Sequence, residues 1–337
     1  MLLVILGAGA SYDSAPSRPA SDSRYNSMSE RPPIANDLFG DRQYFGNVMN
    51  KYPQCLPIIQ QLRDMPEGTV EKQLQKLQTE AANYPTRLQQ LAAIRYYLQE
   101  ILFELPRTWL KETQSISNYL ALVDHIRKSG ERAGFVTFNY DTLLDGALEQ
   151  FGCTFNDFPS YIENHLPLIK IHGSVSWGRL STAPIDIRGK RVDIANSVIN
   201  SYSPEFITNQ YVIVGESPPA PRQDRAVFPA LAIPVESKLQ FECPAYHVEA
   251  LKSLLPQVTK ILVIGWRGTE EPFLNLLREK IKKADLVMVV NGDKSKSEEA
   301  STNLGRAQIL TPRYINFDGG FTEFFKSGAA DSFFGRS

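Results

Sequence analysis

The chain begins with the stretch MLLVILGAGAS, residues 1–11, and this stretch decides how the rest is interpreted. Residues 1–6 are apolar and predict a short strand that is buried on both faces, as the strands of parallel sheets are. Gly7 and Gly9 follow, and two glycines at this spacing allow a tight turn in which the backbone approaches a ligand closely. The amide N–H groups of such a turn, and the start of a following helix, suit an anion such as a pyrophosphate. The stretch therefore predicts a nucleotide-binding loop at the end of the first strand.

The continuation departs from the fingerprint G-x-G-x-x-G of dinucleotide-binding dehydrogenases. Tyr12 stands where the third glycine would be, and residues 12–33 are rich in Ser and Pro with no pattern of a strand. That fingerprint also needs an acidic residue about 20 positions on, at the end of a second strand, to bind a ribose hydroxyl. The sequence thus argues against an ordinary NAD-dependent dehydrogenase. A glycine turn that only joins a strand to a helix, without a ligand, is the alternative at this point.

The bulk composition is that of a globular protein in a reducing compartment. The chain has 337 residues, 42% of them hydrophobic, and a formal net charge of −1, which gives no support for nucleic acid or an acidic membrane as a partner. Cys55, Cys153 and Cys243 are far apart and lack C-x-x-C spacing, which argues against disulfides and a structural zinc site. Residues 1–6 are too few for a signal peptide or a membrane span. We therefore expect a cytoplasmic protein without a metal site and without a membrane segment.

Residues 53–128 have the pattern of amphipathic helices. Apolar residues recur there at three- and four-residue spacing among Gln, Glu, Lys and Arg. Pro85 and Pro106 are expected to divide the region into separate helices, because proline lacks the N–H that a helix interior needs. With no strand pattern inside it, the region predicts a helical insertion that serves as a structural module.

After this region, short apolar runs alternate with helical patterns. The expected strands are residues 134–138, 166–171, 211–214, 260–264 and 286–290. Such alternation predicts an α/β fold, a Rossmann-like parallel sheet with helices on both faces and an inserted helical module. Ligands of such sheets bind outside the carboxyl ends of the strands. Polar or glycine residues follow four of the strands, at 7–9, 139–141, 172–173 and 291–293, so we expect these segments to converge on one crevice.

Two residues at these strand ends have side chains suited to catalysis. His172 follows an apolar strand and precedes Gly173, which leaves room for a ligand. With an unperturbed pKa near ~6.5, an imidazole can act as a base at neutral pH. Asn139 supplies a fixed amide that can orient a water or a sugar hydroxyl but cannot transfer a proton. The alternatives are structural, namely a packed histidine and helix capping by Asn139 and Asp141.

Two further strand ends are open to two interpretations. Asn291 and Asp293 can hydrogen-bond ribose hydroxyls or an adenine edge, although the sequence N-G-D also favours a simple turn. Gly265 and Trp266 follow the strand at 260–264 and could support the adenosine half of a nucleotide. The residues alone leave both possibilities open.

Taken in order, these segments resemble the sirtuin-like family. Residues 7–11, GAGAS, match its GAGxS phosphate loop, and residues 137–141, TFNYD, match its T-x-N-x-D motif. The pair His172-Gly173 matches the catalytic H-G, and residues 264–266 and 290–291 match the later nucleotide-contacting segments. The longer strings TFNYDTLLD and IKIHGSVSW look like the forms typical of bacterial anti-phage members. The resemblance covers roughly residues 1–325.

The resemblance implies a site for NAD⁺ as the substrate. Asn139 and His172 would be catalytic, the first contacting the nicotinamide ribose and positioning a water, the second acting as a base on a ribose hydroxyl or on that water. Asp141 would help to recognise the carboxamide, and the turn at 7–11 would hold the pyrophosphate. The residues implied to bind the dinucleotide are Gly7, Ala8, Gly9, Ser11, Thr137, Asp141, Gly173, Gly265, Trp266 and Asn291.

The sequence also departs from the sirtuin deacylases, which carry a zinc ribbon with two cysteine pairs. No such pairs are present and the insertion is helical, and zinc-free members of this kind resemble NAD glycohydrolases that deplete NAD in infected cells. The resemblance therefore implies an NAD⁺ glycohydrolase (NADase), a hydrolase that releases nicotinamide and ADP-ribose as the effector of antiviral defence by abortive infection. An NAD-dependent protein deacylase and a non-catalytic sensor of NAD or ADP-ribose are the alternatives.

The same resemblance implies a division of the chain into domains. Residues 1–50 and 130–325 would form the sirtuin-like Rossmann NAD-binding domain, residues 51–129 the helical insertion module, and residues 326–337 a C-terminal tail. A toxic NADase has to be held inactive until it is triggered, and the sequence contains no obvious sensor domain. We therefore expect a homo-oligomer, a regulatory or sensor protein as partner, or both.

Overall fold

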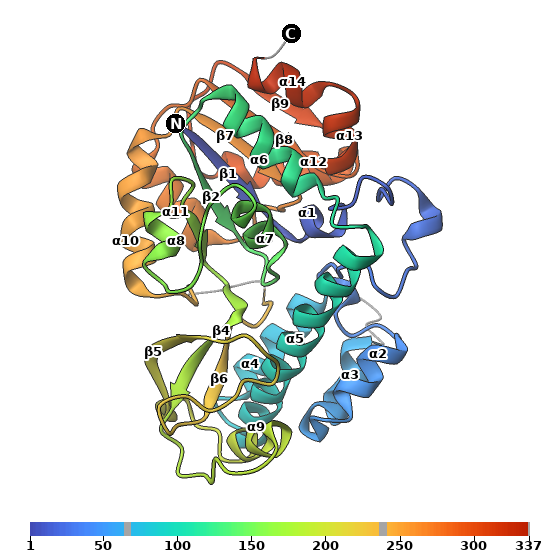
Figure 1. Ribbon diagram of the computed structural model, residues 1–337, viewed down its shortest axis with the longest axis vertical. Helices are drawn as coiled ribbons and strands as arrows, with labels where there is room; N and C mark the ends of the chain where they lie inside the picture. The colour runs from blue at the N-terminus through green and yellow to red at the C-terminus, as the bar shows by residue number, and fades with distance from the viewer. Residues whose placement is uncertain (64–68, 236–240, 336–337) are drawn as a thin grey trace. The chain divides into compact units, whose positions relative to one another are not determined.

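The computed structural model describes residues 1–63, 69–235 and 241–335, and the chain divides into two compact units (Figure 1). Unit 1 consists of Met1–Pro32, Pro106–His172 and Lys238–Ser337. Unit 2 consists of Pro33–Leu105 and Gly173–Ser237.

A six-stranded parallel sheet forms the centre of unit 1, with the strand order β3-β2-β1-β7-β8-β9. Its strands are β1 (Leu2–Leu6), β2 (Ala133–Thr137), β3 (Leu168–Lys170), β7 (Lys260–Ile264), β8 (Leu286–Val290) and β9 (Tyr314–Phe317). Strand β1 lies between β2 and β7, so the order of the strands reverses there, as in the Rossmann fold. The predicted fold class is confirmed.

Helices surround this sheet. They are α1 (Ala8–Tyr12), α6 (Asn118–Ser129), α7 (Leu143–Glu149), α8 (Ser160–Glu163), α10 (Ala245–Leu254), α11 (Glu271–Lys280), α12 (Lys294–Gly305), α13 (Gly320–Lys326) and α14 (Ala329–Phe334), with short 3₁₀ turns η1 (Ser23–Tyr25) and η5 (Leu255–Gln257). Leu3 and Ile5 of β1 share one hydrophobic core with residues of α10, α11 and α12. Every residue of β1, β2 and β8 is buried, because both faces of the sheet are covered.

Unit 2 combines helices with a small antiparallel sheet of order β5-β4-β6. Its elements are η2 (Ala35–Asp37), α2 (Gln43–Met49), η3 (Pro53–Cys55), α3 (Leu56–Arg63), α4 (Val70–Glu80), most of α5 (Pro85–Glu112), β4 (Gly173–Ser181), α9 (Arg191–Asn200), η4 (Pro204–Phe206), β5 (Ile207–Ile213) and β6 (Val227–Leu231). Tyr96 of α5 packs edge-on against Phe228 of β6 at 5.6 Å, and its hydroxyl donates to the Val227 carbonyl at 2.9 Å. These contacts join the long helix to the sheet.

Two predictions about the elements were wrong. Pro85 begins α5 as predicted, but Pro106 lies inside this helix and does not end it. Buried side chains on both sides of the proline, Leu105 and Trp109 among them, hold the helix together by packing in spite of the missing N–H. Of the strand predicted at 211–214, residues 211–213 lie in β5, which belongs to the antiparallel sheet and not to the parallel one, and which is half-exposed along its length.

The compact units have other boundaries than the domains predicted from the sequence. Residues 173–237, assigned to the Rossmann domain, group with residues 33–105 in unit 2, and helix α6, assigned to the helical insertion, belongs to unit 1. The segment predicted as a tail contains the end of α13 and the whole of α14, while residues 336–337 lie outside the described residues. Sequence patterns show elements but not which elements pack together, and this is where the two divisions differ.

Candidate active site

The residues that follow the parallel strands lie at one edge of the sheet of unit 1. Leu6, the last residue of β1, is in register with Thr137 of β2 and Ile264 of β7. Thr137 is in turn in register with Lys170 of β3, and Ile264 with Val290 of β8. The predicted site segments at 7–9, 139–141, 172 and 291–293 therefore start from neighbouring carboxyl ends.

The glycines of the first turn bring two stretches of backbone into direct contact. Gly7 N–H donates to the carbonyl of Ile264, and Gly9 N–H to the carbonyl of Gly265, each at 3.0 Å. A Cβ on Gly7 would lie 2.5 Å from the Gly265 oxygen. A Cβ on Gly265, whose φ is +64°, would lie 2.2 Å from Ala10 N. Only glycine fits at this crossing of the two turns.

The N–H groups of Gly7 and Gly9, which the motif predicts to bind an anion, donate to backbone carbonyls at this crossing. Besides Gly7 and Gly9, Ala10 also donates within the turn, to the Gly7 carbonyl at 2.9 Å. Ala8 is exposed, and its N–H makes no hydrogen bond in the described part of the chain. Ala8 therefore offers an amide that a phosphate oxygen can reach.

Asn139 is held in one orientation by three oxygens. Its Nδ2 lies 3.0 Å from the Gly7 carbonyl, 3.0 Å from Ser11 Oγ and 3.2 Å from the Tyr119 hydroxyl. Because a carbonyl oxygen can only accept, the contact to Gly7 fixes which side of the amide faces the turn. Asn139 Oδ1 is buried and has no hydrogen-bond partner among the described residues. Leaving a buried acceptor without a donor costs about 1–3 kcal/mol, so this oxygen is suited to a donor from a bound molecule.

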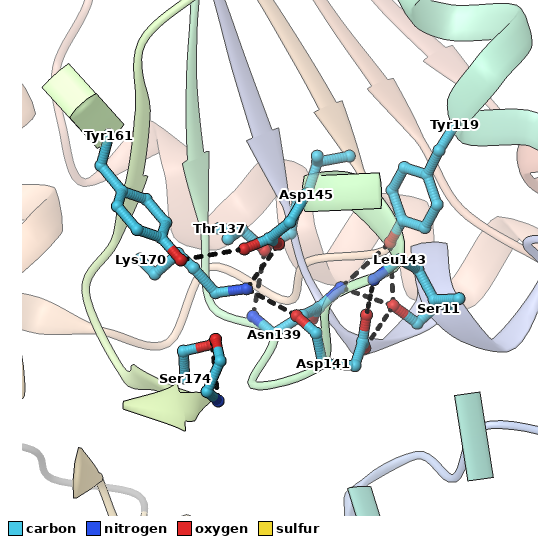
Figure 2. A network of polar contacts seen from close by, with 12 residues as sticks. Ser11, Tyr119, Thr137, Asn139, Asp141, Leu143, Asp145, Tyr161, Lys170 and Ser174 are labelled. Atoms are coloured by element: carbon cyan, nitrogen blue, oxygen red, sulfur yellow. Dashed lines mark hydrogen bonds and ion pairs between the residues drawn. The ribbon is translucent and has the colours of Figure 1, made fainter. Parts of the chain in front are cut away.

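A chain of hydroxyl groups next to Asn139 ends on Asp141 (Figure 2). Ser11 Oγ donates to Asp141 Oδ2 at 2.7 Å, so it is an acceptor for the Tyr119 hydroxyl 2.8 Å away. Asp141 Oδ1 accepts from the Leu143 N–H at 3.0 Å. Burial raises the pKa of Asp141, against the lowering effect of the Lys170 charge and the Ser11 hydrogen bond. Burial also raises the pKa of Tyr119 well above its ordinary value, so this hydroxyl stays a donor.

Thr137 and Lys170 support the same turn from the strands. Thr137 Oγ1 accepts from the Asn139 N–H at 3.1 Å and donates to the Leu6 carbonyl at 3.4 Å. Lys170 Nζ pairs with Asp145 of α7 at 2.7 Å, and both side chains are buried. The turn after β2 is thus held from several directions.

His172 lies beside the turn that carries Asn139. Its ring meets Phe138 edge-on at 4.9 Å between centroids and stacks with Tyr140 at 6.1 Å. These are the two chain neighbours of Asn139, and His172 itself is only 4% exposed. The predicted pair of catalytic residues therefore occupies equivalent places after two adjacent strands.

Trp266 also packs against Phe138. The two rings stack at 4.9 Å with an interplanar angle of 13°, and the indole N–H donates to Glu270 at 2.6 Å. Trp266 is part of the core that also contains Phe273. Its contacts are those of a packed residue next to the glycine crossing.

In the part of the chain that the structure describes, Asn139 has no hydrogen bond to Gly173 or Asn291. Gly173 begins β4 in unit 2 and has a φ of +83°, which favours glycine. Asn291 is 7% exposed, and its Nδ2 donates to the Lys296 carbonyl at 3.2 Å. Asp293 caps α12 by accepting from the Lys296 N–H at 2.9 Å, which is the turn that the sequence N-G-D also allowed.

The long loop after α1 is organised by Arg31. This residue is fully buried, and its guanidinium donates to the carbonyls of Tyr25, Tyr12 and Arg18 at 3.0, 2.6 and 2.8 Å. The same group lies over the ring of Trp109 at 5.1 Å. A single side chain thus fixes a segment for which the sequence predicted no regular structure.

Three residues of the site were missed at the level of sequence. Lys170 carried a signal, because a lysine in the otherwise apolar run LIKI needs a buried partner. Asp145 gave the matching signal on the apolar face of a helix. Tyr119 gave none, since it lies in a helix that the sequence assigned to the insertion.

The described residues contain no cluster of three or more His, Cys, Asp or Glu side chains placed to hold a metal ion. Among the same residues, no helix is both long and apolar enough to cross a membrane.

Comparison with known proteins finds similarity only among solved structures. No protein-family model and no curated protein matches the chain. A Sir2 homologue variant in complex with ADP-ribose is 13% identical, with a TM-score of 0.46, over 99% of this chain and 90% of that one. A Sir2 homologue in complex with NAD is 12% identical, with a TM-score of 0.44, over 99% and 87% of the two chains. Sir2Tm bound to a propionylated peptide is 11% identical, with a TM-score of 0.41, over 98% and 93%.

Proposed function

We propose that this protein is a sirtuin-like NAD⁺ glycohydrolase, which converts NAD⁺ and water into nicotinamide and ADP-ribose. The observation that carries the proposal is Asn139, whose amide is fixed by Gly7, Ser11 and Tyr119 while its buried Oδ1 has no donor. An acceptor of this kind at the carboxyl edge of a Rossmann-like sheet suits a ribose hydroxyl or a water molecule.

The reaction needs little acid catalysis, because nicotinamide leaves as a neutral molecule from a cationic C–N bond. The work of the site is to stabilise the oxocarbenium-like centre and to place the nucleophile. In this proposal Asn139 Oδ1 accepts from the water or the adjacent ribose hydroxyl, and His172 takes the proton. Asp141 faces the nicotinamide carboxamide while it orients Ser11.

The turn after β1 would bind the pyrophosphate. Ala8 supplies an exposed, unused N–H, and the Gly7, Gly9 and Gly265 crossing keeps the backbone free of side chains there. Asn291 would serve the adenosine ribose at the end of β8. The neighbouring order of β2, β1, β7 and β8 in the sheet supports this assignment, because the segments that would contact the dinucleotide follow these strands.

The strings TFNYDTLLD and IKIHGSVSW support a place among bacterial anti-phage effectors that deplete NAD⁺ during abortive infection. An effector of this kind has to be silent in healthy cells. Assembly into a homo-oligomer or binding of a sensor protein would supply that control.

Incubation with NAD⁺ and chromatography of the products tests the proposal directly. We expect nicotinamide and ADP-ribose in equal amounts, and His172→Ala should lower the rate by at least ~10²-fold, the usual contribution of a general base. Nicotinamide release that requires an acyl-lysine peptide would instead identify a deacylase. Tight binding of NAD⁺ without any product, in the free and in the assembled protein, would identify a sensor.

A further inference from the structure

Lys170 is a fully buried cation beside the candidate site. It is the last residue of β3, its side chain is 0% exposed, and its Nζ lies 2.7 Å from Asp145 Oδ2, a carboxylate that is itself 6% exposed. A buried ammonium is strongly unfavourable without such a partner, so the pair explains how the lysine is tolerated in the sheet. It does not explain the second contact that Lys170 makes.

The second contact is to the backbone of the turn at 139–142, which carries Asn139. Lys170 Nζ donates to the main-chain carbonyl of Asp141 at 2.5 Å. The turn at 139–142 is neither helix nor strand, and side chains hold it: Thr137 Oγ1 accepts from the Asn139 N–H, and the Asp141 carboxylate accepts from the Leu143 N–H. Lys170 thus adds a charged donor where the regular ladders of hydrogen bonds have ended.

Lys170 and the hydroxyl groups of Ser11 and Tyr119 reach the turn from different sides. Thr137 and Lys170 are in register, so Lys170 reaches the turn from the neighbouring strand. Figure 2 shows it approaching Asp141 from one side while Ser11 and Tyr119 lie on the other. The positive charge also favours the ionised form of Asp141, the form that accepts from Ser11 Oγ through Oδ2.

We infer that Lys170 is a positioning residue, which clamps the turn at 139–142 so that Asn139 and Asp141 keep their orientation toward the substrate. Asp145 neutralises the charge of Lys170 and holds its Nζ in place. The inference rests on the proposed function, since it concerns the site at which NAD⁺ would bind. It goes beyond it in assigning the geometry of the site to an ion pair that touches no substrate.

A pair of substitutions separates positioning from simple stabilisation. Lys170→Met alone leaves the Asp145 carboxylate buried without its cation, so this variant is expected to be unstable. Lys170→Met combined with Asp145→Leu removes both charges and replaces them with apolar side chains of similar volume, which is often neutral for stability. The matched control is Lys260→Met with Glu131→Leu, because this pair, 3.0 Å apart, joins the start of β7 to a loop at the amino edge of the same sheet.

The measurements are thermal unfolding, the rate of nicotinamide release, and NAD⁺ affinity by calorimetry on the intact protein. We expect the Lys170/Asp145 double variant to fold and yet to release nicotinamide about 10²-fold more slowly, with weaker NAD⁺ binding, because small displacements of catalytic groups cost about this much. The Lys260/Glu131 double variant should keep its rate.

A Lys170/Asp145 double variant that does not fold, beside a folded Lys260/Glu131 double variant, would overturn the inference, because the pair would then serve stability. A folded Lys170/Asp145 double variant with wild-type rate and affinity would overturn the inference, and so would equal losses in both double variants. If the wild-type protein binds NAD⁺ but releases no nicotinamide, the proposed function fails. The inference on Lys170 is then tested by affinity alone: weaker NAD⁺ binding by the Lys170/Asp145 double variant supports it, and unchanged binding overturns it. A wild-type protein that neither binds nor cleaves NAD⁺ overturns both.

Discussion

Asn139 and Asn291 are the same residue type at the same edge of one sheet, and each is 7% exposed, but their partners differ. Asn139 binds Gly7, Ser11 and Tyr119, which come from two other parts of the chain, the segment 7–11 and helix α6. Asn291 donates to Lys296, five positions further on. One side chain is fixed by tertiary structure and the other by a local turn.

The aspartates that follow them repeat the difference. Asp141 accepts from Ser11, 130 positions away, and burial raises its pKa. Asp293 accepts from the N–H of Lys296 and caps α12, and the hydrogen bond from the Lys296 side chain is the main cause of its lowered pKa. The equal burial of Asn139 and Asn291 therefore hides a difference in how the two side chains are held. Asn139 is held by distant elements and keeps an unused acceptor, its Oδ1.

The largest expected effect is on the two asparagines. Asn139→Ala should lower kcat for nicotinamide release by at least ~10²-fold, because the oriented acceptor is lost, as for other preorganised polar groups of active sites. Asn291→Ala should leave kcat nearly unchanged and raise KM for NAD⁺ by less than about tenfold, or ~1.4 kcal/mol, since it would contact the distant adenosine ribose. Steady-state kinetics on both variants measures this split. A kcat loss in Asn291→Ala equal to that of Asn139→Ala would break the comparison.

A smaller effect is expected at Tyr119. Tyr119→Phe removes one buried hydroxyl that lies 2.8 Å from Ser11 Oγ and 3.2 Å from Asn139 Nδ2. The loss of such a hydrogen bond is worth about 0.5–1.5 kcal/mol, so kcat should fall by roughly two- to thirteenfold. Tyr96→Phe, which removes a buried hydroxyl in unit 2, is the control and should alter stability without altering kcat. Equal rates in the two variants would show that the Asn139 amide does not depend on Tyr119.

The turn that carries Asn139 and the turn that carries Asn291 also differ in how far the sequence predicts their contacts. Local patterns suffice for the strands around β1, for the N-G-D turn and for the order of polar strand ends, because each depends on neighbouring residues. They do not indicate that Tyr119 of α6 reaches Ser11, nor that the glycines of the first turn cross Gly265. Both contacts depend on how distant segments pack. The prediction that Pro106 ends a helix is wrong for a related reason, since packing on either side of a proline can keep a helix intact.

The smallest expected effect is a difference in pH dependence between Asp141 and Asp293, tested with Asp141→Asn and Asp293→Asn. Asparagine keeps the size of the side chain and, at position 293, the ability to cap a helix. The measurement is the free energy of unfolding of each variant and of the wild type, between pH 7 and pH 3.

The two aspartates should change stability in opposite directions. The pKa of Asp141 is raised above 3.8 in the folded protein, so protons bind to the folded state first as the pH falls toward 3.8, and the wild type gains stability relative to Asp141→Asn. The pKa of Asp293 is lowered below 3.8, so as the pH falls through that value the unfolded state binds protons first, and the wild type loses stability relative to Asp293→Asn. The second change should be slight and should vanish in high salt, because Asp293 is a surface cap, whereas the first should persist. If the stability difference between the wild type and its variant changed with pH in the same direction for both aspartates, Asp141 would be solvated like a surface carboxylate. The contrast between Asn139 and Asn291 would then not extend to the aspartates that follow them.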